Sequence, residues 1–142
     1  MARNIKLRIW RGNSETGSLQ DVSVEANEGE VVLDVIHRVQ ATQMGDLAVR
    51  WNCKAGKCGS CSVEINGKPR LACMTQMANF AEDETITITP LRAFPVIKDL
   101  VTDVSFNYKK RLKRSLIFES ALKRFPYLAA ANSIQASICH LI

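Results

Sequence analysis

Four cysteines that lie close together in the sequence constrain this chain more than any other feature. They are Cys53, Cys58, Cys61 and Cys73. Their spacing, C-x₄-C-x₂-C-x₁₁-C, is the plant-type spacing of a [2Fe–2S] cluster. Three of the thiolates come from one short loop, which must curl around the metal, and Gly56 and Gly59 permit this because glycine tolerates positive φ. The backbone N–H groups of such a loop point inward and offset the negative charge of a ligated cluster.

Two other uses of clustered cysteines compete with this interpretation. A structural zinc site uses two CxxC-like pairs, and here only Cys58 and Cys61 form such a pair. A disulfide framework suits an extracellular chain, but the N-terminus has no apolar secretory segment and the cysteine count of five is odd. The spacing and the glycines therefore favour iron–sulfur ligation by all four cysteines. A zinc-stabilised binding module stays as an alternative.

Length, hydropathy and charge bound the class of protein. The 142 residues suit one domain with a core of its own and a tail. No apolar run reaches the roughly 18 residues of a membrane span. The net charge is +5, but no aromatic-interleaved basic patch or helix-turn-helix pattern indicates nucleic-acid binding. Reduced thiols without an export signal predict a cytoplasmic protein.

Basic side chains gather around the cysteine loop, opposed in the segment 50–73 by a single acid, Glu64. They are Arg50, Lys54, Lys57, Lys68 and Arg70. Positive charge favours the reduced, more anionic state of a cluster, so we expect these residues to raise its potential. They also offer a docking surface to an acidic partner. The alternative interpretation is a set of solvated surface charges.

The pattern along the chain predicts an α+β fold. Alternation of apolar and charged residues indicates a hairpin within the first 30 residues, and the apolar residues of 31–39 are spaced as one amphipathic helix. Asn66-Gly67 is a strong turn signal between strands at Ser62–Ile65 and Lys68–Cys73. Thr85–Thr89 is the last clear strand. A mixed sheet packed on one helix in this order suits a ferredoxin-like β-grasp.

Beyond Pro90 the spacing becomes helical. We expect one helix from Val96 through Val104 and a second, amphipathic one over 112–123. Trp51, directly before the cysteine loop, is expected to pack in the core. His37, among charged neighbours on the helix predicted for 31–39, is assigned no role.

These motifs together resemble the iron–sulfur subunit of bacterial succinate dehydrogenase/fumarate reductase. Three parts carry the resemblance: the CGSC core, the INGxxxLAC hairpin and the segment PVIKDLVTDVSFNYKK. RIWRG and VVLDVIHRVQ also fit, so the resemblance covers roughly residues 3–110. In that family the four matching cysteines ligate the [2Fe–2S] centre. Some members have Asp at the third position, where this chain has Cys61, so the resemblance implies ligation by thiolates alone.

The resemblance implies electron transfer in the tricarboxylic acid cycle and respiratory chain. The subunit would relay electrons between a flavoprotein subunit and downstream centres and quinone, in a complex that interconverts succinate and fumarate. The FAD and the dicarboxylate chemistry would belong to the flavoprotein, because this chain offers no catalytic constellation. Membrane-anchor subunits would hold it peripherally on the cytoplasmic face of the membrane. A stand-alone ferredoxin electron shuttle is the alternative function.

The chain departs from the family after the YKK motif. Family members continue into a helical domain whose cysteines hold a [4Fe–4S] and a [3Fe–4S] cluster. Here only Cys139 follows Cys73, so we expect neither cluster and no such domain. We predict a [2Fe–2S] β-grasp domain over 1–92, a linker helix over 93–110 and an atypical tail over 111–142. A truncated gene, a frameshift or a variant tail would each explain that tail.

Overall fold

The structure is a computed structural model, and it describes residues 3–110 and 112. Its named elements are β1 (Arg3–Gly12), β2 (Gly17–Ala26), α1 (Val32–Thr42), β3 (Ser62–Ile65), β4 (Lys68–Leu71), the 3₁₀ helix η1 (Met77–Asn79), β5 (Thr85–Thr89), β6 (Val96–Lys98) and β7 (Val101–Thr102). All of them belong to a first compact unit that ends at Asp103. The second unit begins at Val104.

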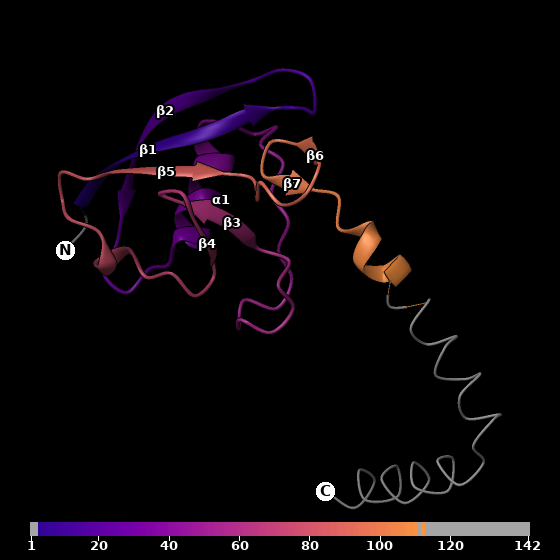
Figure 1. The fold of residues 1–142 in the computed structure, drawn as a ribbon. Helices are drawn as coiled ribbons and strands as arrows, with labels where there is room; N and C mark the ends of the chain where they lie inside the picture. Colours follow the sequence, from indigo (N-terminus) through magenta and orange to yellow (C-terminus); the bar gives the residue numbers. More distant parts are fainter. Residues whose placement is uncertain (1–2, 111, 113–142) are drawn as a thin grey trace, which may run out of the picture. The chain divides into compact units, whose positions relative to one another are not determined.

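A mixed sheet is the centre of the first unit. Its five strands follow the order β2-β1-β5-β3-β4 (Figure 1). The central strands β1 and β5 are parallel, with Leu7 opposite Ile86, and the other neighbours are antiparallel. The predicted N-terminal hairpin is confirmed as β1 and β2, and Thr85–Thr89 is confirmed as β5.

The core lies between one face of the sheet and α1. Alternate residues of β1, namely Ile5, Leu7 and Ile9, are buried, whereas the residues between them face solvent. Helical spacing places the apolar side chains of α1 on the same core; they are Val32, Leu33, Val35, Ile36 and Val39. The two periodicities meet on one apolar surface, and burial of that surface drives the fold. The α+β prediction is therefore confirmed.

The Asn66-Gly67 turn forms as predicted. Both residues have positive φ, 49° and 74°, as a two-residue hairpin turn requires. Strand β4 ends at Leu71, two residues earlier than the sequence suggested. There the chain turns, because the N–H of Met74 donates to the carbonyl of Leu71 at 3.0 Å.

The predicted helix from Val96 through Val104 is wrong. This stretch forms the hairpin of β6 and β7 (Figure 1), and helical residues begin only at Ser105. Asp99 causes the difference: it has a φ of 49°, and its buried carboxylate accepts the N–H groups of Gly12 and Ala48, each at 2.9 Å. Tertiary hydrogen bonds thus override the helical spacing.

The domain prediction changes accordingly. The stretch from 93 to 103 belongs to the first compact unit and is not a linker helix. Apart from Leu112, the predicted tail over 111–142, its helix over 112–123 and Cys139 lie outside the described residues. In the described part of the chain, no helix is long and apolar enough to cross a membrane.

Candidate iron–sulfur site

The cysteine loop, residues 53–61, connects α1 to β3 and curls back on itself. Gly56 and Gly59 have φ of 69° and 72°, so both adopt the left-handed conformation for which the sequence analysis required glycine. Lys54 also has positive φ, 52°. This conformation is unusual for a residue with a Cβ, and no sequence pattern predicted it.

Backbone N–H groups of the loop converge on the first two cysteines. The Sγ atom of Cys53 accepts the N–H groups of Ala55, Lys57 and Cys58, each at 3.4 Å. The Sγ atom of Cys58 accepts the N–H of Ser60 at 3.4 Å. The predicted inward orientation of the loop amides is therefore confirmed. These donors would compensate the negative charge of a ligated cluster.

The other two cysteines lie in the core. Cys61 precedes β3 and Cys73 follows β4, with side chains only 5% and 6% exposed. The N–H of Ala72 donates to the carbonyl of Cys61 at 3.1 Å. The β3–β4 hairpin therefore brings together two cysteines that are separated in the sequence.

The pKa values of Cys58 and Cys61 are shifted in opposite directions. The side chain and backbone N–H of Ser60, followed by contacts with Cys53, lower the pKa of the exposed Cys58 thiol to about 6. Burial raises the pKa of the Cys61 thiol. Cys58 in the loop thus favours the thiolate, whereas Cys61 in the core favours the thiol until a cation compensates its charge.

The structure brings the four cysteines together as two pairs. All four are free, without disulfides. The N–H of Cys58 donates to the Sγ atom of Cys53 at 3.4 Å, and Cys61 and Cys73 lie at the same end of the β3–β4 hairpin. Within residues 3–110, no group of three or more His, Cys, Asp or Glu side chains is arranged to hold a metal ion. Ligation of a [2Fe–2S] cluster by all four thiols, two from each pair, therefore stays a prediction.

The first turn of α1 holds the segment around Cys73. The N–H of Val32 donates to the carbonyl of Thr75 at 2.9 Å, and the N–H of Leu33 donates to that of Ala72 at 3.0 Å. Helix-start N–H groups normally find a side-chain acceptor, but the residue before α1 is Val31, which has none. That absence was the signal in the sequence that another segment would cap the helix, and the sequence analysis missed it.

The basic residues noted in the sequence are exposed, but they are not equivalent. Lys57, Lys68 and Arg70 extend from the loop and from β4. The guanidinium of Arg50 donates to the carbonyl of Thr102 at 3.3 Å, on β7. Lys54 is held by neighbours on α1 and at the start of the loop. The effect of these charges on a cluster potential stays a prediction.

The prediction that Trp51 packs in the core is wrong. Its side chain is 48% exposed, and its ring meets that of His37 edge-on with centroids 5.0 Å apart. The Lys54 Nζ lies 5.1 Å from the centroid of the Trp51 ring. Burial, and then the charge of Lys54, lower the pKa of His37. Trp51 therefore forms part of the loop's surroundings at the surface.

Comparison with known families gives the class of protein that this fold and site define. The family model of the 2Fe-2S iron–sulfur cluster binding domain matches residues 6–109. The chain belongs to this family, and its cofactor is a [2Fe–2S] cluster. This finding decides between iron–sulfur and zinc in favour of the former.

Among the individual relatives of this chain are iron–sulfur subunits of fumarate reductases. The chain is 36% identical over 107 residues to the fumarate reductase iron–sulfur subunit of Wolinella succinogenes, covering 72% of this chain and 44% of the relative. It is 43% identical over 74 residues to the corresponding subunit of Mycobacterium tuberculosis, covering 52% of this chain and 30% of the relative. These matches confirm the resemblance seen in the sequence. The chain spans less than half the length of either relative.

A solved structure agrees in fold. A chain of the Mycobacterium smegmatis Sdh1 complex in the apo form is 68% identical and superposes with a TM-score of 0.77. The match covers 78% of this chain and 46% of that one. The ferredoxin-like α+β fold is therefore shared with a subunit of a succinate dehydrogenase-type complex.

Proposed function

We propose that this chain transfers single electrons through a [2Fe–2S] cluster ligated by Cys53, Cys58, Cys61 and Cys73. The observation that carries the proposal is the placement of these thiols: backbone N–H groups bind the sulfurs of Cys53 and Cys58, and the core encloses Cys61 and Cys73 at one end of the β3–β4 hairpin. When bound, such a cluster supplies one-electron chemistry. The loop N–H groups stabilise negative charge at the Cys53 and Cys58 sulfurs. Burial of Cys61 and Cys73 keeps water from the other half of the site.

The role follows from the relatives. The matched proteins are iron–sulfur subunits of fumarate reductase and a chain of an Sdh1 complex. By this similarity the chain acts within a succinate dehydrogenase/fumarate reductase, an oxidoreductase, and receives or donates electrons at the FAD of a flavoprotein subunit. Membrane-anchor subunits would place it on the cytoplasmic face of the membrane. Succinate–fumarate conversion and quinone chemistry belong to the whole complex.

The exposed basic residues of the loop and β4 support docking to a dedicated partner. Four of them, Lys54, Lys57, Lys68 and Arg70, are exposed, and complementary charges steer and orient electron-transfer partners. A stand-alone shuttle would use the same loop. The two functions differ in whether the chain forms a stable complex with a flavoprotein.

The test starts with the cluster. Protein purified without oxygen is expected to hold about two irons and two acid-labile sulfides per chain and to give an electron paramagnetic resonance signal when reduced. Mixed with the flavoprotein subunit and succinate, it is expected to co-elute with that subunit and to develop the same signal. A colourless protein with one zinc would contradict the cluster. A reducible cluster without co-elution would favour the shuttle.

A further inference from the structure

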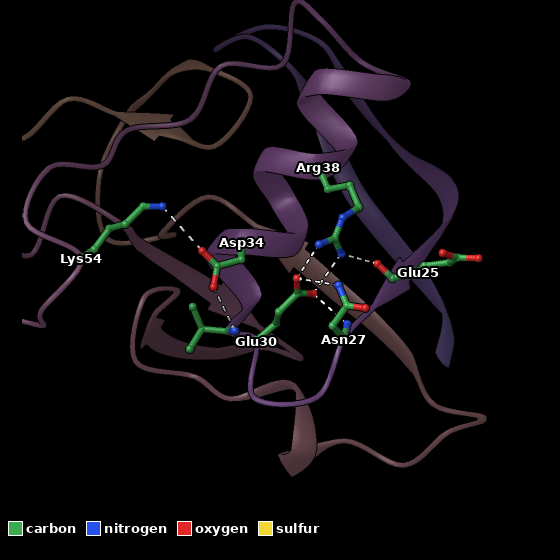
Figure 2. Close-up of polar contacts among 7 residues, drawn as sticks. Glu25, Asn27, Glu30, Asp34, Arg38 and Lys54 are labelled. Atoms are coloured by element: carbon green, nitrogen blue, oxygen red, sulfur yellow. Dashed lines mark hydrogen bonds and ion pairs between the residues drawn. The ribbon is translucent and has the colours of Figure 1, made fainter. Parts of the chain in front are cut away.

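One ammonium of the cysteine loop, that of Lys54, has Asp34 and Trp51 as neighbours. Figure 2 shows the Lys54 side chain reaching from the cysteine loop toward Asp34 on α1, with Lys54 Nζ 3.6 Å from Asp34 Oδ1. The other carboxylate oxygen of Asp34 accepts the N–H of Val31 at 3.3 Å. The Trp51 ring lies 5.1 Å from the same ammonium, a cation–π distance. Asp34 thus joins the start of α1 to the loop.

The position of this ammonium matters because of what surrounds it. Lys54 directly follows Cys53, whose sulfur accepts three loop N–H groups. Asp34 lies in the first turn of α1, the turn in which the N–H of Leu33 binds the carbonyl of Ala72, next to Cys73. The Lys54–Asp34 ion pair therefore joins the residue after Cys53 to the helix turn that supports the Cys73 segment.

We propose that Asp34 and Trp51 hold the Lys54 ammonium as a fixed positive charge beside the cluster, and that Lys54 is a positioning residue that makes the cluster easier to reduce. The inference rests on the ligand assignment proposed above. The redox step is the gain of one electron from an external reductant, with no bond made or broken. A fixed cation lowers the free energy of the added negative charge.

Lys57 gives the contrast within the same loop. It carries the same charge and is also exposed, but in the described part of the chain no ion pair holds its ammonium. The Lys54 side chain is itself 47% exposed, so water and salt screen both ammoniums, but no ion pair among the described residues restricts the position of the Lys57 ammonium. Its average effect on a nearby charge is accordingly smaller than that of an ammonium held in one place. Lys57 is therefore the matched control for Lys54.

The experiment measures the midpoint potential of the purified, cluster-loaded protein by a redox titration followed by electron paramagnetic resonance. Lys54→Gln is expected to lower the equilibrium constant for one-electron reduction by roughly threefold to tenfold, where tenfold corresponds to about 59 mV. Lys54→Arg is expected to keep the potential within about twofold of the original constant, because the charge stays. Lys57→Gln also removes one positive charge. It is expected to change the logarithm of the reduction equilibrium constant by less than half as much as Lys54→Gln does.

Two further variants test the positioning itself. Trp51→Leu changes no charge, and it is expected to lower the potential in the same direction as Lys54→Gln, but by less. Asp34→Asn also removes a negative charge, so its single effect is ambiguous in sign; the informative quantity is a double-mutant cycle. In the Asp34→Asn background, Lys54→Gln is expected to have at most half of its original logarithmic effect.

Iron and sulfide content are determined first, because they separate a failure of the proposed cluster binding from a failure of the proposed role of Lys54. A protein without a [2Fe–2S] cluster would contradict the proposed function itself. A loaded protein in which Lys54→Gln and Lys57→Gln shift the potential equally would overturn only the positioning role. The same holds if Trp51→Leu leaves the potential unchanged or if the Asp34→Asn background leaves the Lys54→Gln effect undiminished.

Discussion

The two halves of the candidate site are built in different ways. The loop half, Cys53 and Cys58, is partly or fully exposed and is surrounded by backbone N–H donors. The core half, Cys61 and Cys73, is buried and lies at the open end of the β3–β4 hairpin, away from its turn. Local backbone geometry makes the first half, and tertiary packing makes the second.

The difference shows how one small site can both stabilise negative charge and exclude water. Loop donors stabilise negative charge, and they lower the pKa of Cys58 to about 6. Burial excludes water from the core half but raises the pKa of Cys61, so the Cys61 thiolate needs a cation to compensate its charge. A site made of two loop halves would be open to solvent. A site made of two core halves would resist deprotonation before metal binding.

The largest expected effect comes from replacing one cysteine in each half. Cys58→Ser and Cys73→Ser are both expected to lose most of the iron, because each removes one of four thiolate ligands. In cluster-free protein, Cys73→Ser is also expected to lower the free energy of unfolding by about 1–3 kcal/mol, since it buries a hydroxyl. Cys58→Ser is expected to stay within about 0.5 kcal/mol of the original. Iron content and urea unfolding measure the two effects.

Cys139→Ala is the control for this pair and is expected to retain full iron. Equal destabilisation by the Cys58 and Cys73 substitutions would contradict the division into an exposed and a buried half.

A smaller effect is expected from Gly56→Ala. The residue has a φ of 69°, and an added Cβ would lie 3.0 Å from Cγ and Sδ of Met74, the neighbour of Cys73. The substitution thus strains the loop half and displaces the residue next to the core half. We expect it to weaken cluster retention by about 1–2 kcal/mol, measured as iron lost to a chelator over time.

Gly59→Ala is the matched control, because its φ of 72° imposes the same backbone strain but the nearest atom to an added Cβ is 4.0 Å away. Adding Met74→Ala to Gly56→Ala is expected to reduce the loss to the level of Gly59→Ala. If it does not, the two halves are not coupled through Met74.

The last expected effect lies farthest from the cysteines and concerns the support of the core half by α1. Arg38 forms a two-pronged ion pair with Glu30 beside the start of that helix (Figure 2). The hydrogen bonds from Arg38 lower the pKa of Glu30 from 4.5 to about 2. We expect Glu30→Gln to lower the free energy of unfolding by about 1–2 kcal/mol at pH 7, measured by urea unfolding of cluster-free protein.

The lowered pKa of Glu30 also predicts how the effect of Glu30→Gln on the free energy of unfolding depends on pH. A carboxylate with a lowered pKa stabilises the folded state fully above its unfolded value. The difference between Glu30→Gln and the original protein is therefore expected to persist above about pH 5 and to shrink as the pH falls from 4.5 toward 2. A difference that stays constant between pH 7 and pH 3 would show that the ion pair does not stabilise the start of α1. Asp21→Asn, in an exposed ion pair with Arg8, is the control with little expected effect.

Much of the site could be predicted from the sequence because its determinants are local. The spacing of four cysteines specified the cluster type, Gly56 and Gly59 marked the turns of the loop, and Asn66-Gly67 marked the hairpin that returns to Cys73. Each signal depends on residues a few positions apart, whose backbone preferences act before any distant contact forms.

Other features were decided only by the tertiary structure. The hairpin of β6 and β7 replaced a predicted helix because the carboxylate of Asp99 binds N–H groups of Gly12 and Ala48, far away in the sequence. Trp51 is at the surface, although its large apolar side chain suited the core. The contacts of α1 with the Cys73 segment and of Asp34 with Lys54 join elements that no spacing rule connects. Sequence periodicity reports local preference, whereas burial and long-range hydrogen bonds depend on which segments the finished fold brings together.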